Sequence, residues 1–107
     1  MIGIQLFLIF LINQHTQKSG TYNMNRKEIL LKAESLVNGP RAKEYGDAHE
    51  NHARIARMWS VLLDTDVSVE QVYQCMIAVK LCRLIETPEH EDSWVDICGY
   101  GALGGED

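Results

Sequence analysis

The sequence predicts an all-α fold, a compact bundle of four helices. Apolar residues recur with the 3.6-residue period of a helix throughout residues 24–107, whereas the alternation typical of a strand is absent from that region. Helix-capping and helix-stopping residues divide the same region into four segments. Short connections between them favour neighbouring helices that pack against one another.

The first two helices are predicted at residues 25–37 and 47–63. Asn25 can cap the first helix, and the Asn-Gly-Pro sequence that follows it stops a helix. Asp47 begins a capping-box pattern at the start of the second helix. An apolar stripe runs along the whole second helix and includes His52, which we expect in the core.

The last two helices are predicted at residues 68–86 and 89–103. Ser68 begins another capping box. Apolar residues wrap much of the circumference of the third helix, which predicts a central helix with neighbours on more than one side. Pro88 suits the first position of the fourth helix, and a Gly-Gly pair follows its end.

Composition limits the classes of function. A chain of 107 residues forms one domain at most and is near the low end for a self-sufficient core, so we expect self-association. The net charge of −5 disfavours general electrostatic binding of nucleic acid. The three cysteines form no CxxC pair, and we expect them to be small buried hydrophobes in a reducing compartment.

Residues 1–23 are predicted to be an N-terminal appendage, and we place the helical domain at residues 24–107. The apolar run at residues 1–12 is too short to span a bilayer, which needs about 20 residues. It also lacks the basic region and cleavage site of a signal peptide. We favour an over-extended reading frame over a membrane-associating segment, which we do not expect, or an extra packing element.

The acidic face of the fourth helix is the first candidate site. Asp92 and Asp96 are four residues apart and therefore share one face of a helix, among apolar neighbours. Glu89 extends the same strip. Carboxylates on a face that can be buried are costly unless a cation neutralises them. A divalent metal such as Mg²⁺ can do so, and so can Lys80 and Arg83 of the preceding helix.

Four further residues complete the candidates. Lys80 and Arg83 are helical neighbours that can bind a phosphate or a carboxylate, or form a solvated pair. Glu50 offers a third carboxylate for a metal, although capping also explains it. Tyr45 can stack on a nucleotide base or pack over the start of the second helix. The sequence has no pattern for nucleophilic catalysis or for a glycine-rich phosphate loop.

Several segments along the chain form a set in a fixed order: Glu44-Tyr45-Gly46-Asp47, Glu50-Asn51-His52, Ile55-Ala56, Trp59-Ser60, Met76, Lys80, Arg83-Leu84, Asp92-Ser93, Asp96-Ile97 and Gly99-Tyr100. Taken together and in order, these segments resemble a family of small helical proteins encoded by bacteriophages. That family is in turn similar to the MazG-like all-α nucleotide pyrophosphohydrolases. The acidic motifs of those enzymes are compared with these segments below.

The resemblance implies acidic motifs on two helices that bind Mg²⁺, cleavage of a nucleoside triphosphate to the monophosphate and pyrophosphate, and assembly as dimers or tetramers. Asp92 and Asp96 resemble the second motif, with a spacing that is one residue longer. The preceding helix carries Lys80 and Arg83 where the first acidic motif is expected. Only the acidic pair that ends at Glu50, further upstream, offers a substitute.

We therefore expect an oligomeric, phage-type MazG-like protein of the host cytoplasm that binds a nucleotide with Mg²⁺ and hydrolyses a (d)NTP. In this hypothesis Glu50, Asp92 and Asp96 hold the metal and are catalytic, while Lys80 and Arg83 contact the phosphates. The alternative is a non-catalytic module that sequesters a nucleotide or binds a host protein, with the basic pair bound to the aspartates inside the bundle. A third hypothesis is an interaction module that binds neither nucleotide nor Mg²⁺.

Overall fold

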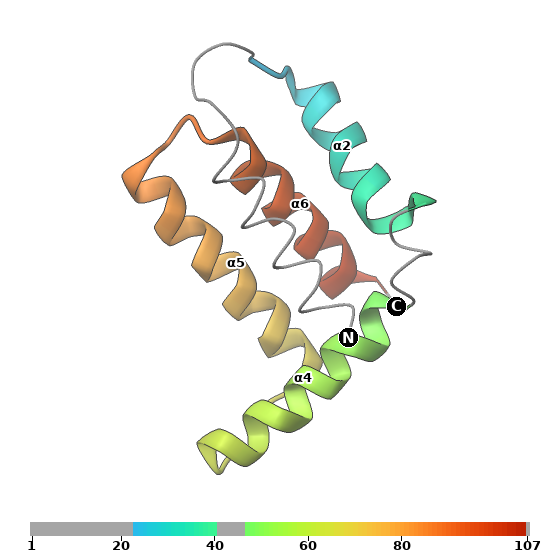
Figure 1. Cartoon of the computed structure of the whole chain (residues 1–107), viewed down its shortest axis with the longest axis vertical. Coiled ribbons are helices and arrows are strands. Elements are labelled where there is room, and N and C mark those ends of the chain that lie inside the picture. Colours follow the sequence, from blue (N-terminus) through green and yellow to red (C-terminus); the bar gives the residue numbers. More distant parts are fainter. Residues whose placement is uncertain (1–22, 41–46, 107) are drawn as a thin grey trace.

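The computed structural model of the protein describes residues 23–40 and 47–106. Within these ranges it contains four helices and no strand (Figure 1), which confirms the all-α prediction. The helices are α2 (Arg26–Asn38), α4 (Ala48–Leu63), α5 (Val69–Glu86) and α6 (Glu91–Gly105). Each predicted helix lies within two residues of the observed one at either end.

Among the described helices, α6 lies between α5 and α2 (Figure 1). It runs antiparallel to α5, because Lys80 pairs with Asp96 while Tyr73 lies beside Gly104 near the other end. A Cβ on Gly104 would lie 3.3 Å from the Cβ of Tyr73, so the absence of a side chain lets the two helices approach closely.

Helix α2 packs along the other side of α6 and runs parallel to it. Lys32 lies beside Asp92, and Val37 lies beside Gly99 one to two turns further along both helices. A Cβ on Gly99 would lie 3.4 Å from Val37 Cγ1, so a residue much larger than alanine would push the two helices apart. This approach places a lysine of α2 against the acidic face of α6.

Helix α4 crosses the end of α5 where that helix begins (Figure 1). The His52 ring lies 4.5 Å from the Tyr73 ring between their centroids. The predicted apolar stripe of α4 is buried only along the first part of the helix, since Leu62 and Leu63 are 74% and 64% exposed. The core where α4, α5 and α6 meet contains Ala48, Ala56, Val72, Tyr73, Met76, Tyr100 and Leu103.

Side chains cap α2, α4 and α5 at the residues that the sequence predicts. The Asn25 side chain accepts from the Glu28 N–H at 2.9 Å, and Ser68 forms a complete capping box with Gln71. Asp47 accepts from the N–H of His49, two residues on, instead of forming the predicted box. These bonds satisfy backbone donors that have no partner within the helix.

The start of α6 differs from the prediction. The N-cap is His90, and both Pro88 and Glu89 lie in the turn before the helix. The Trp94 Nε1–H donates to the Pro88 carbonyl at 2.9 Å, which fixes that turn. Glu89 is exposed and does not extend the acidic strip of Asp92.

The cysteines also depart from expectation. Cys75 and Cys82 are exposed and Cys98 is partly buried, and all three are free thiols. Cys75 and Cys82 lie on the face of α5 that points away from α4 and α6. Helix α5 therefore has neighbours on two sides, as predicted, but no other described helix covers the face that carries Cys75 and Cys82.

Candidate functional site

The aspartates of α6 are buried together. Asp92 is 5% and Asp96 1% exposed, and both lie on the part of α6 that faces its neighbours. Two buried carboxylates one helical turn apart repel each other and are costly to desolvate. Each of the two carboxylates pairs with a lysine, and the two lysines belong to different helices.

Lys80 of α5 forms an ion pair with Asp96. The Lys80 Nζ lies 2.9 Å from the Asp96 Oδ2, and each side chain is only 1% exposed. This distance is in the range of charge-assisted hydrogen bonds between an ammonium and a carboxylate. Lys80 was predicted either to pair with the aspartates or to contact a phosphate, and its ammonium pairs with Asp96.

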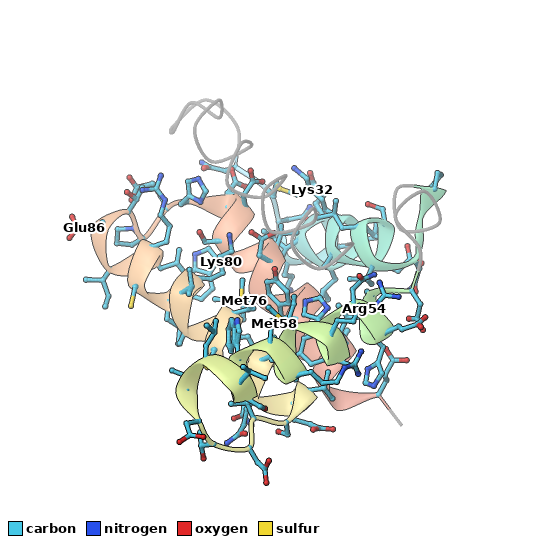
Figure 2. The ribbon with its side chains drawn as sticks, turned by 60° about the horizontal axis from the view of Figure 1, so that its bottom comes forward. Lys32, Arg54, Met58, Met76, Lys80 and Glu86 are labelled. Atoms are coloured by element: carbon cyan, nitrogen blue, oxygen red, sulfur yellow. The ribbon has the colours of Figure 1, made fainter. Side chains whose placement is uncertain are left out.

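Lys32 of α2, on the opposite side of α6 from α5, forms an ion pair with Asp92. The Lys32 Nζ lies 3.4 Å from the Asp92 Oδ1, and the side chains are 40% and 7% exposed. Figure 2 shows Lys80 on α5 and Lys32 on α2, on either side of α6. Sequence reasoning missed Lys32, which lies 60 residues before its partner.

The four charges form one electrostatic cluster, which we call the lysine–aspartate cluster (Lys32, Lys80, Asp92 and Asp96). The pKa of Asp96 is raised to about 6: burial raises it most, the Lys80 charge and hydrogen bond lower it, and the smaller effects of Asp92, which raises it, and Lys32, which lowers it, follow. Desolvation is the largest of these effects. The lysines therefore only partly compensate the cost of burying this carboxylate.

Arg83 follows Lys80 by one helical turn and behaves differently. Its side chain is half-buried, and its buried Nε has no hydrogen-bond partner among the described residues. Within residues 23–40 and 47–106 it forms no ion pair with Asp92 or Asp96. A buried guanidinium donor with no acceptor is costly, which marks Arg83 as a place where an anionic ligand would be stabilised.

The third predicted carboxylate does not join the cluster. Glu50 lies in the first turn of α4 with 66% of its side chain exposed, and it pairs with Arg54 at 3.9 Å. No group of three or more His, Cys, Asp or Glu side chains that could hold a metal occurs in the described part of the chain. Tyr45, the candidate for base stacking, lies outside the described residues.

A histidine fixes the start of the helix that carries the aspartates. The His90 Nδ1 accepts from the Ser93 N–H at 3.3 Å and lies 3.0 Å from the Ser93 Oγ. Because Nδ1 accepts from the backbone, it carries no proton in this arrangement. The cap holds the first turn of α6, and with it Asp92, in place.

A second buried group, of aromatic rings, belongs to the core. The rings of His52, Tyr73 and Tyr100 lie 4.5 to 6.4 Å apart between centroids. His52 is 1% exposed, its Nδ1 donates to the Ala48 carbonyl at 2.6 Å, and burial lowers its pKa. It is therefore a core histidine, as predicted, and its lowered pKa favours the neutral ring.

A comparison with protein families matches residues 28–107 to the domain of unknown function DUF6378. The chain belongs to this family. The match includes the whole lysine–aspartate cluster and Arg83, and begins inside α2.

Two relatives of this DUF6378 protein are the Gene 55 proteins of mycobacterial phages. The protein of Mycobacterium phage L5 is 43% identical over 76 residues, and that of Mycobacterium phage D29 is 38% identical over 74 residues. These alignments cover 70% and 69% of this chain and 49% of each relative. The chain thus spans about half the length of these curated relatives, and they support the predicted bacteriophage origin.

No solved structure matches the chain. Among the described helices, none is both long and apolar enough to cross a membrane.

Proposed function

We propose that this protein is a non-catalytic nucleotide-binding module of a bacteriophage, a MazG-like bundle that forms oligomers in the host cytoplasm. One observation carries the proposal: the Lys80 ammonium lies 2.9 Å from the Asp96 carboxylate, and both side chains are almost fully buried. A carboxylate held in this way already has its counter-charge. Removing the lysine to admit a metal would leave an uncompensated buried charge, which is costly.

The carboxylates as arranged do not fit a Mg²⁺ ion. Mg²⁺ takes oxygen ligands in octahedral geometry and usually keeps several waters. Asp92 and Asp96 instead face ammonium groups, and Glu50 is turned to solvent. A metal at this place would have to displace two lysines, so we propose binding without hydrolysis.

The surrounding cations suit a phosphate chain. Lys32 is 40% exposed, so its ammonium can turn from Asp92 to an incoming anion. The Arg83 Nε is a buried donor that lacks an acceptor among the described residues, and a guanidinium matches phosphate oxygens in two-bond geometry. Together with Lys80, the site has three basic groups and two carboxylates. The raised pKa of Asp96 reduces the negative charge that these carboxylates carry.

A thermal-shift screen tests the proposal. Nucleoside mono-, di- and triphosphates are compared in EDTA and in Mg²⁺, and we expect a higher melting temperature with some triphosphate in both buffers. Binding at about 100 times Kd adds about 2.7 kcal/mol of stability, a shift of several degrees for a domain of this size. Arg83→Gln should abolish the shift, and the exposed control Arg57→Gln should keep it. If none of the nucleotides raises the melting temperature, the proposal is contradicted and a host-protein partner is favoured.

Mg²⁺-dependent cleavage of a (d)NTP is the second candidate. The observation that favours it is the closeness of Asp92 and Asp96, whose charges interact across one turn of α6, as a second acidic motif requires. Glu50, Asp92 and Asp96 would be the catalytic residues. Pyrophosphate released in Mg²⁺, and lost in Asp96→Asn, would support this candidate over the first.

A further inference from the structure

The second half of α4 extends past the start of α5 (Figure 1) and exposes large apolar side chains. The exposed fractions are 61% for Met58, 77% for Val61, 74% for Leu62 and 64% for Leu63. The loop after the helix lies against the side that carries Ser60, whose Oγ accepts from the Val67 N–H at 2.8 Å. Neighbouring apolar side chains that stay in contact with water on a folded domain mark a site of interaction.

Two arginines lie beside these apolar side chains on the exposed side of α4. Arg57 is exposed and forms no ion pair within residues 23–40 and 47–106. Arg54 donates to the Asn51 side chain at 3.3 Å and lies 3.9 Å from Glu50, with both charged side chains more than half exposed. Such a pair contributes little stability and a guanidinium has five donors, so both arginines retain donors for a carboxylate of a partner.

A hollow of the opposite sign lies at the end of α4. Its lining residues are Ser60, Val61, Asp64, Thr65 and Asp66. The two aspartates are exposed, and neither forms an ion pair with another described residue. A basic side chain suits this hollow, because its aliphatic part can lie against Val61 while its charge reaches an aspartate.

We propose that this surface of α4 binds an amphipathic helix of another protein. The α4 surface, as we call it, consists of Arg54, Arg57, Met58, Val61, Leu62, Asp64 and Asp66. The partner helix carries acidic residues at one end, apolar residues in its middle and a basic residue at the other end. Val61 and Leu62 follow Met58 by three and four residues, which is the spacing of a ridge that packs into the groove of a second helix.

Charge determines which partner fits. Each copy of this chain carries a net charge of −5, which opposes a second copy and attracts basic proteins in general. The α4 surface excludes a uniformly basic helix, because its cations would face Arg54 and Arg57. It equally excludes a uniformly acidic helix, which would meet Asp64 and Asp66. This binding goes beyond the proposed function, since the α4 surface shares no residue with the lysine–aspartate cluster or with Arg83.

Three designed peptides test the α4 surface of the full chain. Each is a labelled helix of about 14 residues with the same apolar stripe, and its two charged ends are acidic and basic, both acidic, or both basic. In fluorescence anisotropy we expect the acidic–basic peptide to bind most tightly. The net charge of the protein alone would instead favour the peptide with two basic ends. Tightest binding of either other peptide, or binding of none of the three, would overturn the proposal.

Substitutions test the location of the contact. Val61→Glu should abolish binding with an unchanged circular dichroism spectrum, because it places a charge at the apolar centre of the contact. Arg54→Glu/Arg57→Glu should weaken binding of the acidic–basic peptide by about tenfold and strengthen that of the peptide with two basic ends. The control Arg26→Glu/Lys27→Glu makes the same change of net charge at exposed residues of α2 and should keep the order of the peptides.

Two outcomes of these variants would overturn the proposal. One is binding of the acidic–basic peptide that neither α4 variant changes, which would place the contact elsewhere. The other is a stable wild-type dimer in light scattering that Val61→Glu dissociates, which would assign the α4 surface to a second copy.

Discussion

Replacing Lys80 by methionine removes the cation of the buried pair and keeps most of its aliphatic volume. At 2.9 Å and an effective dielectric of about 20, the attraction between the two charges is about 6 kcal/mol. Part of that is offset because the lysine no longer has to be desolvated. Breaking a buried ion pair typically costs about 3–5 kcal/mol, and we expect the free energy of unfolding to fall by this amount near pH 7.5.

The loss should depend on pH. Because the pKa of Asp96 is about 6, the carboxyl is charged near pH 7.5, and Lys80→Met leaves that charge buried without its nearest counter-ion. Near pH 5 the carboxyl is mostly neutral, so removing Lys80 costs less unfolding free energy. The destabilisation should therefore be clearly smaller at the lower pH.

Urea denaturation followed by circular dichroism measures both effects. The double variant Lys80→Met/Asp96→Leu should return to within about 1 kcal/mol of the wild type or exceed it, because no buried charge is left unpaired. Lys32→Met, whose pair is partly exposed, serves as the control and should cost less than about 1 kcal/mol. A cost below about 1 kcal/mol for Lys80→Met, or an equal cost at both pH values, would refute the reasoning.

Three further predictions follow from burial and close approach. The folded pKa of Asp96, about 6, lies above the ordinary value near 4, so the stability it contributes is fully present below about pH 4 and lost as pH rises through about 6. The unfolding free energy of the wild type minus that of Asp96→Asn should thus fall by about 2 kcal/mol between pH 4 and 7, and a constant difference would contradict this. Burial raises the pKa of Tyr73 to about 12, and its hydroxyl has no hydrogen-bond partner in residues 23–40 and 47–106. Tyr73→Phe should therefore be neutral or stabilising in urea, and a loss above about 1 kcal/mol would reveal a further partner. Gly101→Ala should raise the stability by about 0.5–1 kcal/mol because nothing lies within 4 Å of the new Cβ. Gly104→Ala should gain less, since its Cβ meets Tyr73 at 3.3 Å, and equal melting temperatures for the two variants would argue against this packing.

The helices could be predicted because their signals act over a few residues. Asn25 and Ser68 cap their helices as the sequence indicates. The start of α6 was predicted too early, because His90 takes the cap and Trp94 holds Pro88 in the preceding turn. Histidine is not among the residue types that capping rules favour, so the pattern gave no signal for it.

The candidate site could be predicted only in part. Helical periodicity placed Asp92 and Asp96 on one face of their helix. It also made Lys80 of the preceding helix a candidate partner, and Lys80 pairs with Asp96. The pairing of Lys32 with Asp92 depends on how α2 lies along α6, which no local pattern encodes. The same holds for Glu50, which the crossing of α4 over α5 leaves on the solvent side.

The open face of α5 shows a related limit. Apolar residues around the whole helix predicted contacts on several sides, and α4 and α6 supply two of them. Periodicity shows that a face is apolar but does not show whether the same chain or another copy covers it. The exposed Cys75 and Cys82 were predicted to be buried for this reason.

The central claim is that lysines, and not a metal, neutralise the aspartates of α6. Phosphorus NMR of a nucleoside triphosphate mixed with the protein and Mg²⁺ tests it most directly. We expect the three phosphate signals to shift or broaden on binding and to persist without conversion over hours, with the same change in EDTA. Signals of pyrophosphate and a monophosphate that grow with time, and that Asp96→Asn abolishes, would contradict the account.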